Sequence, residues 1–177
     1  MNMGETYLNI IKKKFLEIKK LGDQTFQQLD DKQLHWSNHE ESNSIAVIIK
    51  HVGGNMISRW SDFLSTDGEK PTRNRDLEFE ASYLPKMELF QIWEQGWQIV
   101  FTALDELTEQ DLLKKVKIRG ENHLVMDAIE RQVSHYSYHV GQIVYIGKLL
   151  KTSEWQSLSI PRGYSEQFNK QMFNKNN

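Results

Sequence analysis

Cysteine is absent from this chain of 177 residues. Its absence excludes disulfide bonds, metal sites built on thiolates and catalysis by a cysteine nucleophile. Any metal ion that the protein binds must therefore be held by imidazole nitrogens and oxygen atoms.

Long apolar runs and a strong net charge are also missing. No window approaches the roughly 18 apolar residues that a membrane-spanning helix needs. The first residues lack the basic and apolar segments of a signal peptide, and the formal net charge is only −2. We therefore expect a soluble, cytoplasmic protein that acts on a small molecule, with neither nucleic acid nor a membrane as partner.

Proline is scarce, and the periodicity of apolar residues between the three prolines is helical. Five Trp and eight Phe supply large side chains for a core. We expect one domain over residues 1–177, with its core at about 5–151 and a tail at 152–177. The expected helices span about residues 4–29, 44–67, 85–107 and 122–151, with linkers at 30–43 and 68–84 and a short extended segment at 116–120.

Four long helices predict an all-α four-helix bundle. The long crossover connection between the second and third helices argues against a simple up-down-up-down path. Inside the second helix, Gly53 and Gly54 each cost about 1 kcal/mol relative to alanine. A helix that keeps both glycines is expected to have a neighbouring element packed closely against it.

Six histidines include two pairs spaced four residues apart. His35 and His39 lie in a linker, where this spacing has no geometric meaning, and we expect a polar surface loop there. His135 and His139 lie in the fourth helix, where residues i and i+4 share one face and can chelate one metal ion. The alternative for this second pair is two buried histidines that hydrogen bond to carboxylates or carbonyls.

His51, on the second helix, is the natural third partner of that pair. Three imidazoles from two helices would leave open coordination positions for water or substrate, as in catalytic zinc sites and some iron or nickel sites. An H-E-x-x-H motif is absent because position 136 is tyrosine, which excludes a zincin-type protease. Asn55, Tyr138 and Gln142 are candidates for orienting ligands, while no residue stands out as a general base.

Several arginines have two interpretations. Arg73 and Arg75 lie in the connection between the second and third helices, and Arg119 and Arg162 are each followed by glycine. They could bind an anion near the site, or they could belong to solvated loops. We favour the solvated loops, because charged loops are ordinary.

The chain resembles the DinB-like superfamily. A lone helical His51 followed far downstream by His135-Tyr-Ser-Tyr-His139-Val-Gly-Gln142 matches its pattern. Further stretches resemble one subfamily of unassigned function, namely Asn43-Ser-Ile-Ala46, Gly68-Glu-Lys-Pro71, Arg73-Asn-Arg-Asp76 and Ile160-Pro-Arg-Gly163. The resemblance covers about residues 5–169.

This resemblance implies an up-down-down-up bundle, a homodimer, and a divalent metal ion, zinc or nickel, held by His51, His135 and His139. Some members of the superfamily transfer low-molecular-weight thiols such as bacillithiol or mycothiol. A metal-dependent thiol S-transferase with such a thiol as cosubstrate is therefore one expectation. The alternatives are a non-catalytic metal-binding or stress-response bundle protein, and a metal-free helical dimer whose histidines belong to the core.

Overall fold

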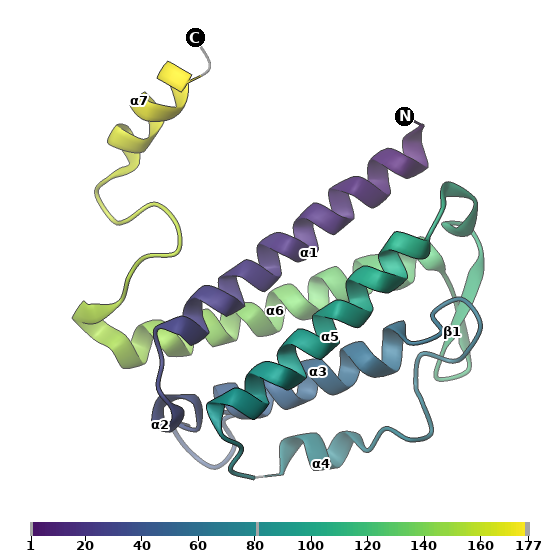
Figure 1. The fold of residues 1–177 in the computed structure, drawn as a ribbon, viewed down its shortest axis with the longest axis horizontal. Coiled ribbons are helices and arrows are strands. Elements are labelled where there is room, and N and C mark those ends of the chain that lie inside the picture. The colour runs from purple at the N-terminus through teal and green to yellow at the C-terminus, as the bar shows by residue number, and fades with distance from the viewer. Residues whose placement is uncertain (1, 81, 176–177) are drawn as a thin grey trace.

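Four long helices make up most of the structure, a computed structural model that describes residues 2–80 and 82–175 (Figure 1). They are α1 (Met3–Gln27), α3 (Ile45–Trp60), α5 (Lys86–Glu106) and α6 (Val125–Lys151). The shorter elements are α2 (Asp31–Leu34), α4 (Arg75–Phe79), η1 (Glu109–Asp111), β1 (Lys115–Ile118), β2 (Glu121–Leu124), η2 (Thr152–Glu154) and α7 (Ser165–Lys175). The expectation of a mainly helical fold is confirmed.

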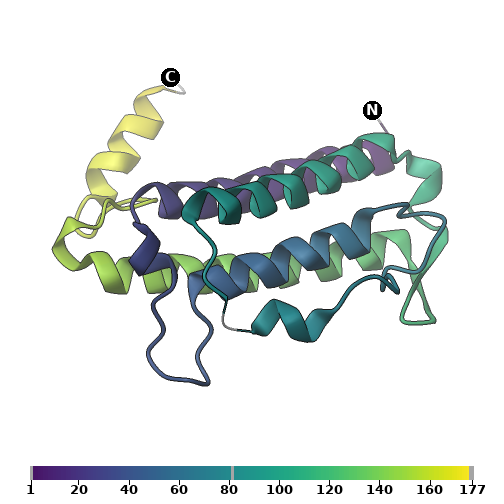
Figure 2. The same ribbon diagram turned by 60° about the horizontal axis from the view of Figure 1, so that its bottom comes forward.

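The long helices form two layers. Figure 2 shows α1 and α5 in one layer and α3 and α6 in the other, with α4 lying beyond α3. The most extensive helix contacts join α3 to α5 and α1 to α6. In Figure 1, α1 and α6 run in one direction, while α3 and α5 run in the opposite direction.

An aromatic cluster at the centre of the core takes one side chain from each long helix. The ring of Phe15 on α1 lies 5.7 Å from Trp60 on α3, 6.0 Å from Trp97 on α5 and 5.9 Å from Tyr136 on α6. All four side chains are almost fully buried. Burial of such large rings is the main force that holds the layers together.

Helix boundaries follow the capping signals in two cases and depart from the expectation in two others. The side chain of Ser44 caps α3 by accepting from Val47 N, and α5 begins directly after Pro85. However, α3 ends at Trp60, not at residue 67, because the chain turns back and Gly68 O accepts from Ser58 Oγ at 2.8 Å and from the Arg59 guanidinium. Residues 121–124 pair as a strand, so α6 begins only at Val125.

The hairpin β1–β2 is the only sheet in the described part of the chain. Its turn is fixed by hydrogen bonds to Asp67, which lies outside the hairpin. Ile118 pairs with Glu121, so Arg119 and Gly120 form a two-residue loop, with φ of 54° and 80°. Positive φ at both positions is typical of the type I′ turn, whose twist matches that of the flanking strands. The Asp67 carboxylate accepts from the N–H groups of Arg119 at 2.8 Å, Gly120 at 2.7 Å and Glu69 at 2.8 Å.

Replacing Asp67 with alanine is expected to lower the free energy of unfolding by about 1 kcal/mol, because three backbone donors lose their acceptor. The pKa of Asp67 lies below its ordinary value, chiefly because the Glu69 N–H stabilises the carboxylate. A depressed folded-state pKa gives stability that is present above the unfolded pKa of about 3.9 and lost as the pH falls through the folded value. Urea unfolding at pH 7 and pH 3 should therefore show a smaller difference between the two proteins in acid. A constant difference would contradict this assignment.

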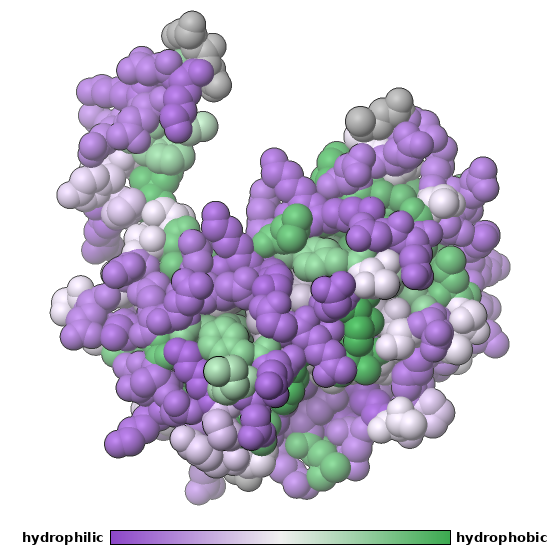
Figure 3. Space-filling view, viewed as in Figure 1, coloured by the Kyte–Doolittle hydropathy of each residue, from purple (hydrophilic) through white to green (hydrophobic). Residues whose placement is uncertain are grey.

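The C-terminal helix α7 lies away from the helix layers, whereas Gln156, nearer the start of the tail, exchanges two hydrogen bonds with Gln28 at the end of α1. Figures 1 and 2 show α7 projecting from the end of α6, and its apolar side chains, including Phe168 and Phe173, are exposed. Figure 3 shows that hydrophilic side chains cover most of the molecule on the side seen there. Within residues 2–80 and 82–175, no helix combines the length and the apolar character needed to cross a membrane.

Candidate metal centre

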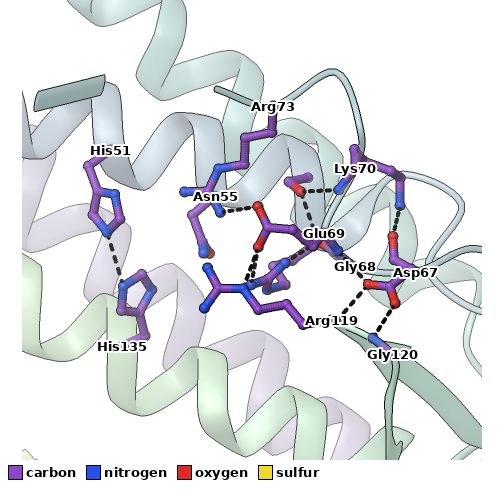
Figure 4. A network of polar contacts seen from close by, with 12 residues as sticks. His51, Asn55, Asp67, Gly68, Glu69, Lys70, Arg73, Arg119, Gly120 and His135 are labelled. Atoms are coloured by element: carbon purple, nitrogen blue, oxygen red, sulfur yellow. Dashed lines mark hydrogen bonds and ion pairs between the residues drawn. The ribbon is translucent and has the colours of Figure 1, made fainter. Parts of the chain in front are cut away.

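Three histidines from two helices meet between α3 and α6. His51 comes from α3, and His135 and His139 come from successive turns of α6. Each ring offers one nitrogen to a shared point, and these nitrogens all lie within 4.8 Å of one another. The Nε2 atoms of His51 and His135 are 3.4 Å apart (Figure 4). The structure thus brings together all three residues that the sequence predicted as ligands.

Two of the rings are oriented from behind by oxygen atoms. His51 Nδ1 lies 2.9 Å from Glu78 Oε2, and His139 Nδ1 lies 3.0 Å from Gln142 Oε1. These oxygens accept, so each Nδ1 carries a proton, and in a neutral ring the lone pair is then on Nε2. His135 Nδ1 is buried without a partner among the described residues. Metal-binding histidines commonly show such hydrogen bonds at the nitrogen opposite the ion, so the donor set fits a divalent metal.

Burial favours the neutral form of the two histidine rings on α6. His51 and His139 are 6% and 8% exposed, and His135 is partly buried. Burial lowers the pKa of His135 to about 3, helped by the neighbouring His139 and His51, and burial also lowers the pKa of His139. At neutral pH both rings therefore have the uncharged form that metals bind.

A buried ion pair stands behind His51. Arg73 binds the Glu78 carboxylate through two parallel contacts of 2.8 Å, and the two side chains are only 5% and 10% exposed. Burial alone would raise the pKa of Glu78, but the hydrogen bonds from His51 and Arg73 prevail and the pKa lies below its ordinary value. A β-carbon on Gly54 would overlap this carboxylate, and one on Gly53 would overlap Ile92. The expected close approach at both glycines is confirmed.

The short helix α4 carries this partner to the site. Glu78 and Phe79 lie at its end, and the ring of Phe79 is 4.8 Å from that of His51. The guanidinium of Arg75 lies 4.8 Å above the Phe79 ring. The long connection after α3 therefore supplies both the charge and the apolar contact that fix His51.

The predicted solvated loop is wrong for Arg73, whose side chain is buried. Three arginines share the neighbouring Glu69 carboxylate, with contacts of 2.9 Å from Arg59, 3.1 Å from Arg119 and 3.5 Å from Arg73 (Figure 4). Burial lowers the pKa of Arg59, and the charges of Arg73 and Arg119 act in the same direction. Arg75 and Arg162 are both exposed, but only Arg162 lies in a loop, because Arg75 is the first residue of α4.

The other histidine pair is not assembled into a site. His35 Nε2 lies 2.8 Å from Leu84 O, and its ring stacks on Tyr83. His39 instead contacts Ser42 within its own loop. The two rings thus have separate partners, as expected for a surface loop.

Among the residues considered for orienting ligands, Gln142 alone contacts a histidine nitrogen. Asn55 Oδ1 accepts from the Tyr136 hydroxyl in the core, and Tyr138 is exposed with its ring 4.9 Å from that of His139. Sequence reasoning did not single out Glu78. Its signals were the Asn74 cap that starts α4 and the missing β-carbon of Gly54, and neither identifies the residue without the fold.

A family model described as "Protein of unknown function (DUF1572)" matches residues 2–164. The matched range contains all three histidines and Glu78, and it ends just before α7. A comparison with curated proteins gave no match.

Proposed function

Since the chain belongs to the DUF1572 family, which is a DinB-like family, we propose that it is a divalent-metal-dependent enzyme that transfers a low-molecular-weight thiol to an electrophile. The observation that carries this proposal is the meeting of three imidazole nitrogens within 4.8 Å of one another. The opposite directions of the α1–α6 and α3–α5 pairs support the up-down-down-up bundle of that superfamily. A homodimer stays a prediction.

The residues of the site have two roles, since some would hold the metal ion and others orient the imidazole rings. His51, His135 and His139 would hold the ion, while Glu78 and Gln142 orient two of the rings. When bound, zinc or nickel would lower the pKa of a coordinated thiol, so that a thiolate is available at neutral pH. Because the chain has no cysteine, the sulfur must come from a cosubstrate.

Access to the site is compatible with a small molecule. His135 is only partly buried, so the triad is not sealed. A surface pocket of about 500 Å³ reaches Gln142, the residue that orients His139, and its lining combines apolar side chains such as Trp36 and Tyr145 with polar residues of the loop at 37–43. None of the three histidines lines the pocket, but it gives room for the organic part of a thiol or an electrophile next to Gln142.

A direct assay tests the proposal. Protein loaded with zinc or nickel is mixed with bacillithiol and 1-chloro-2,4-dinitrobenzene. A carbon–sulfur bond forms, the carbon–chlorine bond breaks, chloride leaves, and the thiol proton passes to solvent. We expect the coloured thioether to form at a rate that depends on the metal and is lost in His139→Ala. A rate equal to that of His139→Ala for either metal would contradict the proposal.

The alternative is a non-catalytic metal-binding protein, and the burial of His51 and His139 favours it. The two functions differ in whether the ion keeps an exchangeable position. A thiol that alters the visible spectrum of the Co²⁺-loaded protein would support the enzyme. A spectrum unchanged by thiol would support the binding protein.

A further inference from the structure

We propose that Arg119 binds an anionic group of the thiol cosubstrate, so that this thiol carries a carboxylate or a similar negative group. This inference rests on the proposed function, and it names the substrate class of the same site. Four observations support it: the fixed position of Arg119, its free terminal nitrogens, the direction of its side chain and the charge around it.

The backbone at Arg119 is held in place. This non-glycine residue has a φ of 54°, in the left-handed region. Its N–H donates to Asp67 at 2.8 Å, and a second tie joins Gly68 N to Lys117 O at 2.8 Å on the adjoining strand. Left-handed non-glycine residues that are fixed by their surroundings are frequent at functional sites. The hairpin therefore carries its arginine on a rigid support.

The guanidinium of Arg119 is only partly used within the protein. Its Nε donates to Glu69 at 3.1 Å, whereas its terminal nitrogens have no partner in the described part of the chain, and the side chain is 57% exposed. By contrast, Arg59 and Arg73 are buried and paired. In Figure 4 the Arg119 guanidinium extends from the hairpin toward the helices that carry His51 and His135. Two free parallel N–H groups suit a carboxylate or phosphate.

The surroundings favour an anion. The ion pairs beside the histidines join three arginines, Arg59, Arg73 and Arg119, to two carboxylates, Glu69 and Glu78. One positive charge is therefore in excess. Three neutral imidazoles would carry no negative charge to offset the two positive charges of a divalent ion. A negatively charged ligand would thus be attracted both by the arginine network and by the metal ion.

A matched pair of thiols tests this inference. Co²⁺-loaded protein is titrated with 6-mercaptohexanoate and with 6-mercaptohexanol, which differ only in the charged end, and binding is read from the absorption that sulfur gives on cobalt. We expect the anionic thiol to bind about tenfold more tightly. Arg119→Gln should remove this preference and leave the affinity for the neutral thiol unchanged. Arg162→Gln is the control, since Arg162 is also exposed and precedes a glycine of positive φ, but lies in the tail.

Equal affinities in the wild type, or a preference that survives in Arg119→Gln, would overturn the proposal. If neither thiol changes the cobalt spectrum, the thiol-transfer function fails, and the anion site is tested without metal. Hexanoate, but not hexanol, should then shift the Nε–H resonance of Arg119 in metal-free protein. No shift with hexanoate would overturn the anion site by itself.

Discussion

Replacing His139 with alanine is expected to abolish stoichiometric metal binding. The wild-type protein, purified without an affinity tag and supplied with zinc or nickel, should hold one ion per chain. Loss of one of three ligands leaves two imidazoles, and we expect the affinity to fall by more than about 100-fold, beyond the loss caused by removing an outer partner. Elemental analysis after gel filtration measures the content, and His51→Ala and His135→Ala should behave alike.

Thermal unfolding tests the same prediction by a second measurement. A ligand that binds only the folded state stabilises it by about 2.7 kcal/mol when its concentration is 100 times the dissociation constant. Zinc should therefore raise the melting temperature of the wild type and leave that of His139→Ala unchanged. His39→Ala is the matched control, because His39 is an exposed histidine with a partner in its own loop. Equal metal content in His139→Ala and the wild type would exclude His139 as a ligand.

The meeting of the three histidines could be predicted from the sequence because helical spacing is a local property. Once residues 122–151 are assigned to a helix, His135 and His139 must share a face. His51 required one more step, the pairing of two helices, and the two glycines that follow it indicated a close neighbour. The long helices were accessible for the same reason, since their apolar periodicity repeats over many turns.

The hydrogen-bond partners of the histidines could not be predicted in this way. Glu78 reaches His51 from 27 residues away, through a connection whose path depends on packing against α3. From the sequence, Arg73 is expected to be a charge on the surface. Only the folded chain shows that its ion pair with Glu78 allows its side chain to be buried. The early end of α3 has the same origin, because the returning Gly68 carbonyl binds Ser58 and Arg59.

Some missed elements did carry local signals. The short helix α2 begins at a capping box, in which Asp30 accepts from Gln33 N and the Gln33 side chain accepts from Asp30 N. The pattern is visible in the sequence, although four residues give too little periodicity to predict a helix. The hairpin at residues 115–124 was expected only as one extended segment, because its second strand has a polar sequence.

Replacing Glu78 with alanine is expected to destabilise the protein by about 3 kcal/mol, because the buried guanidinium of Arg73 loses its two-contact partner. Urea unfolding of the metal-free protein measures this loss. The same substitution removes the acceptor from His51 Nδ1, and loss of such an outer partner typically costs about 10–100-fold in metal affinity. Competition with a chelator measures the affinity.

The double variant Arg73→Met with Glu78→Ala separates the two effects. It contains no stranded buried charge, so most of the lost stability should return. His51 still lacks its acceptor, so the metal affinity should stay as low as in Glu78→Ala. If the affinity recovers together with the stability, Glu78 acts on the metal only through the fold. If the affinity stays low in a stable protein, the carboxylate sets the orientation and the proton position of His51, and the long connection after α3 is part of the metal site.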